Sequence, residues 1–148
     1  MDRSKVAQTI RRHGIRVTAQ RVGILQVLSN AKGHPSAQEI HEQAAEALPG
    51  LNVATVYRAL YQMQEAGLVD LFSTVTGVQR FGYRDPDNPH AHLVCDRCGV
   101  VFELSPQVFS PLAQTLMDES GFKLDARHVV LSGRCQSCRS AQKVDRDD

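Results

Sequence analysis

The sequence predicts an α+β protein with an N-terminal winged helix-turn-helix domain and a smaller α/β domain that contains a four-cysteine zinc site. Two observations lead to this prediction. Four segments of helical periodicity and a strand pair fill residues 3–83, whereas residues 90–140 carry shorter strands and two Cys-x-x-Cys pairs. A length of 148 residues is sufficient for two small domains.

Capping residues delimit the helices of the front half. Thr18 and Asn52 are good N-caps, and Ser36 with Glu39 forms a capping box. The predicted helices cover Arg3–His13, Thr18–Ala31, Ser36–Leu48 and Asn52–Ala66. Leu68–Tyr83 then predicts two strands around Thr76-Gly77. Helices followed by a hairpin are typical of a winged helix-turn-helix.

The fourth predicted helix has two distinct faces. Its apolar residues recur three and four positions apart, at Val53, Val56, Leu60 and Met63. The opposite face carries Thr55, Arg58 and Gln62, with Tyr57 at its margin. Such a helix can enter the major groove of DNA, although an ordinary core helix with a solvated face shows the same pattern.

Arg84–Pro89 is the clearest linker, because two prolines and several turn formers interrupt regular structure there. The formal charge changes sign at this point. Residues 1–84 have ten Lys and Arg against six Asp and Glu, whereas residues 85–148 have seven against ten. A basic front half is consistent with a polyanionic partner such as nucleic acid.

Beyond the linker the sequence predicts a second set of elements. They are a strand through Val94, a strand Val100–Leu104, a helix from Ser105 to about Ser120 and a strand Phe122–Leu131. Residues 141–148 are polar and are expected to form a disordered tail.

Two kinds of metal-binding side chain occur in this half. Cys95, Cys98, Cys135 and Cys138 form C-x₂-C-x₃₆-C-x₂-C. Two thiol pairs at this spacing favour a closed structural zinc site over an iron–sulfur cluster or a redox dithiol. On a strand, His90 and His92 would share one face while Cys95 lies on the other. No signal peptide or membrane span is evident, so we expect a cytoplasmic protein with reduced thiols.

Four segments together resemble the ferric uptake regulator (Fur) family of bacterial metal-dependent transcription factors. They are Gly14–Arg21, His34–Ala37, Val53–Leu60 and His90–Cys95. The resemblance covers nearly the whole chain. It implies a winged-helix DNA-binding domain at residues 1–84, a hinge at 85–89 and an α/β dimerisation domain at 90–140. It further implies a homodimer that binds double-stranded operator DNA, generally as a repressor, when a regulatory metal closes the hinge.

By the same resemblance, the regulatory metal ligands are His34, His90, His92 and Glu103. The family usually has an acidic ligand where this chain has Gly82, and Asp85 or Asp87 is a candidate substitute. Mn²⁺ or Fe²⁺ is favoured at this site, because all four cysteines are committed elsewhere. Zn²⁺ is compatible with a shell of three imidazoles and one carboxylate. We therefore expect two metals per chain and no other small-molecule substrate.

For DNA, we expect base contacts from Arg58 and Tyr57, with Thr55 on the same face, and phosphate or minor-groove contacts from Arg16 and Arg21. Several alternatives remain open. A peroxide sensor that uses iron-catalysed histidine oxidation or a zinc uptake regulator would belong to the same family. A constitutive zinc-ribbon module or, more remotely, a metallohydrolase would not.

Overall fold

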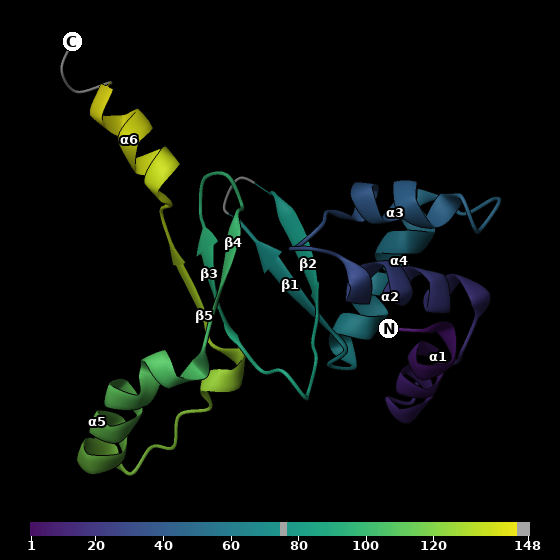
Figure 1. Cartoon of the computed structure of the whole chain (residues 1–148). Coiled ribbons are helices and arrows are strands. Elements are labelled where there is room, and N and C mark those ends of the chain that lie inside the picture. Colours follow the sequence, from purple (N-terminus) through teal and green to yellow (C-terminus); the bar gives the residue numbers. More distant parts are fainter. Residues whose placement is uncertain (75–76, 145–148) are drawn as a thin grey trace. The chain divides into compact units, whose positions relative to one another are not determined.

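The computed structural model describes residues 1–74 and 77–144 and divides into two compact units. Unit 1 comprises Met1–Ser73 and Gly77–Arg84, and unit 2 comprises the chain from Asp85 onward together with Thr74. Figure 1 labels the elements of both units. Among the described residues, no helix is long and apolar enough to cross a bilayer.

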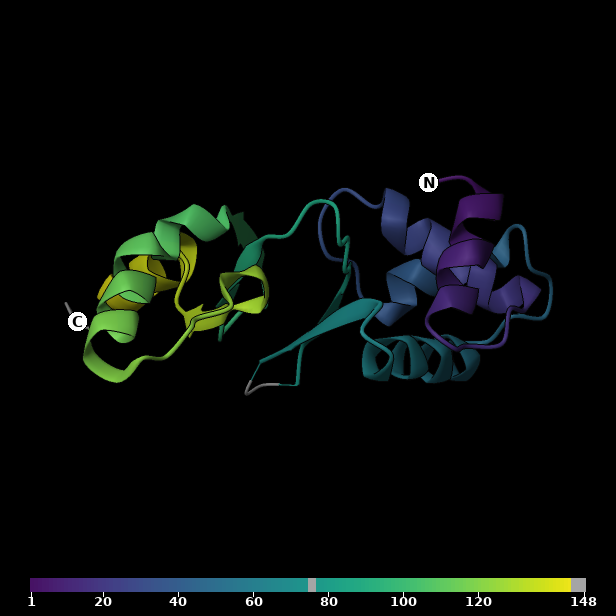
Figure 2. The ribbon, with the colours of Figure 1, turned by 90° about the horizontal axis from the view of Figure 1, so that it is seen from below.

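Unit 1 contains four helices and a hairpin. The helices are α1 (Arg3–Arg12), α2 (Ala19–Asn30), α3 (Ala37–Ala45) and α4 (Val53–Glu65), and the strands are β1 (Val69–Ser73) and β2 (Gln79–Tyr83). The helices pack together and the antiparallel hairpin projects from them (Figure 2). The expected turn at Thr76-Gly77 lies partly outside the described residues.

The predicted caps are confirmed in unit 1. The side chain of Thr18 accepts from Arg21 N–H, and that of Asn52 accepts from Thr55 N–H. Ser36 and Glu39 bond reciprocally in a capping box. Helix α3 ends at Ala45, a turn earlier than expected, and residues 46–50 form turns. Because these caps are set by neighbouring residues, their positions could be inferred from local sequence.

A single hydrophobic cluster holds unit 1 together. Each helix contributes its apolar face, including Ile10 of α1, Leu25 of α2, Ile40 of α3 and Leu60 of α4. Phe81 of β2 is fully buried in the same cluster. Because Val56, Leu60 and Met63 of α4 are all buried in the core, the opposite face of this helix points away from the core.

Unit 2 is built on a three-stranded sheet with the order β4-β3-β5. Its elements are β3 (Ala91–Cys95), β4 (Val101–Leu104), the 3₁₀ helix η1 (Pro106–Phe109), α5 (Ser110–Ser120), the 3₁₀ helix η2 (Ala126–His128), β5 (Val130–Gly133) and α6 (Gln136–Val144). Strand β3 pairs antiparallel with β4 and parallel with β5. Far fewer residues are buried here than in unit 1.

Two expectations for unit 2 were wrong. The strand expected over Phe122–Leu131 is confined to Val130–Gly133. It follows a 3₁₀ turn whose N-cap, Asp125, accepts the backbone N–H of Arg127 with its side chain. Residues 141–144, expected in a disordered tail, belong to helix α6; residues 145–148 lie outside the described residues. In addition, the segment after Ser105 begins as a 3₁₀ helix and becomes α-helical at Ser110.

Candidate metal centres and nucleic-acid interface

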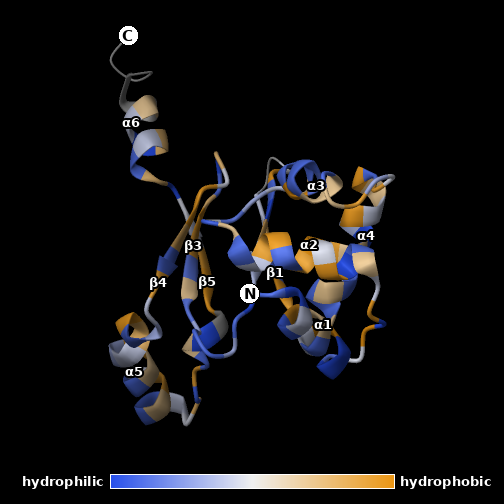
Figure 3. Ribbon diagram, turned by 45° about the vertical axis from the view of Figure 1, so that its right-hand side comes forward, coloured by the Kyte–Doolittle hydropathy of each residue, from blue (hydrophilic) through white to orange (hydrophobic). Residues whose placement is uncertain are grey.

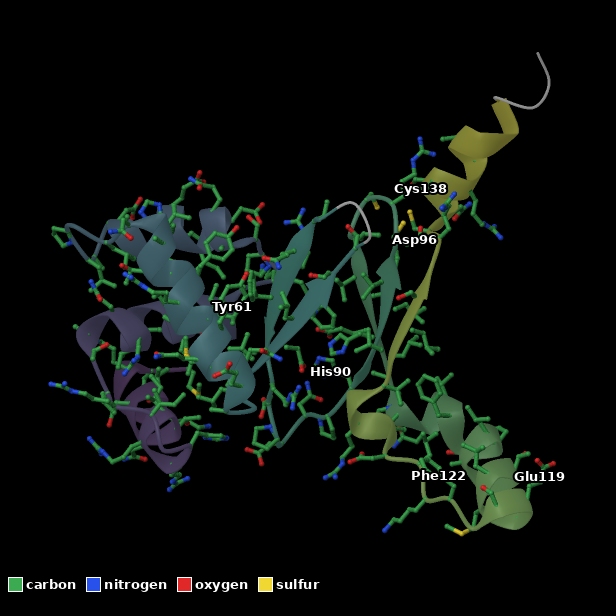
Figure 4. All side chains as sticks on the ribbon, turned by 180° about the vertical axis from the view of Figure 1, so that it is seen from behind. Tyr61, His90, Asp96, Glu119, Phe122 and Cys138 are labelled. Atoms are coloured by element: carbon green, nitrogen blue, oxygen red, sulfur yellow. The ribbon has the colours of Figure 1, made fainter. Side chains whose placement is uncertain are left out.

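The four cysteines converge at one end of the unit 2 sheet. Cys95 ends β3, Cys98 lies in the following turn, Cys135 follows β5, and Cys138 lies in α6. Their Sγ atoms all lie within 4.8 Å of one another. Figure 4 labels Cys138 and Asp96 at this end of the sheet, and the Asp96 carboxylate pairs with Arg134 at 3.2 Å.

This geometry fits a tetrahedral zinc ion. With Zn–S bonds of about 2.3 Å, the sulfurs of a tetrahedron lie about 3.8 Å apart. The distance between Cys98 Sγ and Cys135 Sγ is 3.8 Å. The thiols therefore need little rearrangement to close a four-sulfur shell, which leaves no open position for chemistry.

The electrostatics of the cluster also favour a cation. The N–H of Cys135 donates to Cys95 Sγ, and this bond, with those from Cys98 and Arg97, lowers the pKa of Cys95 to about 6. Burial, followed by hydrogen bonds to the neighbouring thiols, raises the pKa of Cys138 to about 12. Four thiolates this close together require a positive charge between them, and Zn²⁺ supplies it.

A second group of possible ligands lies on β4 and at the start of β3, including His90 just before that strand. His92 is 4% exposed and stands opposite Glu103 in the antiparallel register. His90 Nε2 lies 3.2 Å from Glu103 Oε1, and the rings of His90 and His92 are 4.8 Å apart. Two imidazoles and a carboxylate suit a divalent metal such as Zn²⁺, Mn²⁺ or Fe²⁺.

The linker orients one of these imidazoles. The Nδ1 of His90 lies 2.8 Å from the carbonyl oxygen of Asn88. Donation from Nδ1–H leaves Nε2, the nitrogen nearest Glu103, as the ligand atom. Sequence patterns could not reveal this partner, because it is a backbone carbonyl.

His34 lies in unit 1, between α2 and α3. Its ring meets the ring of Phe72 edge-on, with centroids 5.1 Å apart. A Cβ on Gly82 would stand 2.9 Å from His34 Cδ2, so the absence of a side chain leaves room for the imidazole. Of the candidate substitutes for an acidic ligand, Asp85 accepts the N–H of Asp87 in a local turn, and Asp87 is exposed.

The expected DNA-contacting residues lie along α4, at the start of α2 and, for Arg16, in the segment that precedes α2. Thr55 and Arg58 line one groove with Arg21. The guanidinium of Arg21 donates to the Arg16 carbonyl, at 2.6 Å, and to Gln62 of α4. Arg21 thus ties the two helices together, a role that sequence reasoning missed, although Gln62 had been placed on the correct face.

Aromatic side chains connect α4 with the hairpin. Tyr57 meets Phe81 of β2 edge-on, with centroids 6.5 Å apart, and Tyr61 donates its hydroxyl to Gln79 at 3.1 Å. Tyr61 is labelled on α4 in Figure 4. Tyr57 is therefore half-buried and fixed in direction by the hairpin.

Comparison with known proteins identifies relatives over most of the chain. A sequence model of the ferric uptake regulator family matches residues 12–132. The peroxide operon regulator of Bacillus subtilis is 31% identical over 131 residues, covering 88% of this chain and 89% of that protein. The zinc uptake regulation protein of Mycobacterium tuberculosis is 33% identical over 127 residues, covering 86% and 97%.

Solved structures give the same result. The ferric uptake regulator from Pseudomonas aeruginosa with manganese matches with a TM-score of 0.68 at 34% identity, covering 87% of this chain and 96% of that chain. A zinc uptake regulator complexed with zinc and DNA matches with a TM-score of 0.54 at 27% identity, covering 95% of each.

Proposed function

The chain belongs to the ferric uptake regulator family, and from this premise we propose that it is a metal-responsive repressor that binds operator DNA as a homodimer. A divalent metal held by His34, His90, His92 and Glu103 would fix the winged helices for binding. Two observations carry the proposal: the four thiols form one cluster, and Glu103 of β4 stands opposite His92 of β3 and lies 3.2 Å from His90, just before that strand.

The two metals have different roles in this proposal. Zn²⁺ at the cysteines holds unit 2 together. The regulatory ion would join His34 of unit 1 to ligands of unit 2 and supply charge and fixed geometry, not catalysis. The matched relatives are named as regulators, so we set the metallohydrolase alternative aside.

Exposed apolar surface supports dimerisation through unit 2. Helix α5 buries none of its residues within the chain, although Leu112 and Met117 are large and exposed. Phe122, labelled near the end of α5 in Figure 4, follows this helix and is 58% exposed. The strands of the sheet also carry hydrophobic residues (Figure 3), including Leu131 at the β5 edge. A second copy would cover this surface and pair the edge.

The ligands available to the regulatory site bear on which metal ion acts as the signal. Mn²⁺ or Fe²⁺ is favoured because all four cysteines gather at the other site, which leaves no thiol for a zinc sensor. The function would then be manganese or iron homeostasis in the cytoplasm, where thiols stay reduced.

Peroxide sensing is the second candidate, favoured by the 31% identity with the peroxide operon regulator. It predicts that iron-loaded protein treated with peroxide gains one oxygen atom on His90 or His92. Mass spectrometry of the peptide that contains β3 distinguishes the two functions, since a homeostatic regulator would leave that peptide unmodified.

Gel-shift titration tests the main proposal. Wild-type protein should bind its operator at least tenfold more tightly with regulatory metal than without it. Replacing His90 and His92 together (H90A/H92A) should remove this difference and leave the cysteine-bound zinc in place. H13A is the matched control, because His13 is an exposed histidine at the end of α1. Equal DNA affinity of the wild type with and without metal would refute the proposal.

A further inference from the structure

The first turn of α4 contains a chain of hydrogen bonds that links three side chains. The hydroxyl of Thr55 lies 3.0 Å from Asn52 Oδ1, and Arg58 Nη2 lies 3.2 Å from Thr55 Oγ1. Asn52 Oδ1 also accepts the backbone N–H of Thr55 at 2.8 Å, which is the N-cap bond of the helix.

The polarity of this chain is fixed by chemistry. Asn52 Oδ1 can only accept, so the single hydroxyl hydrogen of Thr55 points to Asn52. The Thr55 oxygen then has its lone pairs available, and Arg58, which can only donate, uses one of them. Reversing any bond would leave two donors or two acceptors facing each other.

The bond holds Arg58 in one orientation without consuming its recognition capacity. It uses one of the five N–H donors of the guanidinium. Arg58 is exposed, whereas Thr55 is half-buried beneath it in the groove that both residues line. A guanidinium held in advance loses less rotamer freedom when its fork engages a base.

We propose that Asn52 and Thr55 are positioning residues that orient Arg58 to read a base in the operator. This inference rests on the proposed DNA-binding function. It assigns Thr55 a role different from the direct DNA contact that its place on the helix face suggests. It also gives Asn52 a second role beyond capping α4.

Two substitutions of Thr55 separate this role from a structural one. T55V keeps the β-branched shape and the capped backbone N–H but removes the hydroxyl. T55S keeps the hydroxyl. The probe is the duplex that metal-loaded, full-length wild-type protein selects from a random pool, together with its single-base-pair variants and an unrelated duplex of equal length.

The ratio of affinities for the selected duplex and for its variant at the guanine read by Arg58 should be about five- to tenfold smaller in T55V than in the wild type. This loss is part of the preference that one forked contact provides. R58A should lose more, and T55S should retain the preference of the wild type. Affinity for the unrelated duplex and the thermal midpoint should be unchanged in T55V, since neither depends on the orientation of Arg58.

An NMR measurement on the free protein provides a second readout. The ¹⁵Nε relaxation of Arg58 should report a more mobile guanidinium in T55V than in the wild type or T55S. Equal discrimination by T55V and the wild type, or equal mobility of Arg58 in both, overturns the positioning role of both residues, because the bonds link Asn52 to Arg58 through the Thr55 hydroxyl. The proposed DNA-binding function would remain. A wild-type protein that selects no duplex overturns the proposed function, and this role with it.

Discussion

The position of the His34 ring depends on the absence of a side chain at Gly82. The imidazole lies against the backbone of Gly82, and an added Cβ would come within 2.9 Å of His34 Cδ2 and 3.4 Å of Phe72 Cε2. The two residues that the imidazole contacts, Gly82 and Phe72, both belong to the hairpin, and Phe72 and Phe81 of this hairpin are buried. The ring therefore has little freedom to move without disturbing the aromatic contact.

We expect G82A to lower the affinity of the histidine site for Mn²⁺ by about tenfold, because displacing a ligand's neighbours typically has effects of this size. Calorimetric titration with the cysteine site already filled by zinc measures this affinity. G133A is the control, since an added Cβ at Gly133 would meet nothing within 4 Å. Unchanged Mn²⁺ affinity in G82A would show that His34 is not a ligand or that its ring moves at no cost.

For single residues, the sequence predicted which side chains are candidate ligands better than it predicted which atoms those side chains contact. The four cysteines were recognised from their spacing, because ligand pairs two residues apart are a local signal. The contact of His34 with Phe72 and the bond of His90 to the Asn88 carbonyl were not. The first depends on tertiary packing, and the second on a backbone atom that every residue possesses.

Secondary-structure elements show the same division between local and non-local causes. The N-caps at Thr18, Ser36 and Asn52 were predicted because each is completed within three residues. Strand β5 was misplaced because its bounds follow parallel pairing with β3, about 38 residues earlier in the chain, a pairing that local periodicity does not encode. Polar composition likewise concealed α6, which begins between Cys135 and Cys138.

The elements of unit 2 depend on the thiol cluster for their cohesion. Among the residues of this unit whose burial the structure describes, few hydrophobic side chains are buried, namely Ala91, Val94, Cys95 and Phe109. The cluster joins the turn after β3 to the segment between β5 and α6. Small cores of this kind usually require a metal to remain folded, and binding of the metal then contributes directly to folding.

We therefore expect C138S, or removal of zinc by a strong chelator, to unfold unit 2 while unit 1 keeps its own cooperative transition. Limited proteolysis should cut within residues 90–140 and spare residues 1–84. S137A is the matched control, because Ser137 is exposed between the two cysteines of the pair. Simultaneous unfolding of both units would show that unit 1 cannot fold alone, despite its complete hydrophobic cluster.

At the scale of the whole molecule, the two units carry opposite charge and separate tasks. The basic front half holds α4, the helix proposed to contact DNA, and the acidic rear half holds the cysteines and most of the proposed regulatory ligands. Arg84, the last residue of unit 1, donates through Nε to Asp70 of β1 at 2.8 Å, which secures the end of the hairpin. Flexing of the linker can therefore begin at Asp85 and leave β2 in place.

If one ion joins the two units, metal and DNA must strengthen each other's binding by the same factor, typically about 5- to 150-fold. Inserting Gly-Ser-Gly-Ser between Pro86 and Asp87 should reduce this factor to within about threefold of unity, because a longer linker lowers the effective concentration of His34 at the other ligands. Fluorescence titration of DNA at fixed metal, and of metal at fixed DNA, measures the factor in both directions. The same four residues appended after Asp148 should leave it unchanged, because they lengthen no segment between the proposed ligands. Full coupling in the linker variant would mean that the metal acts within unit 2 alone, by changing how two copies associate and not how far each unit 1 can move.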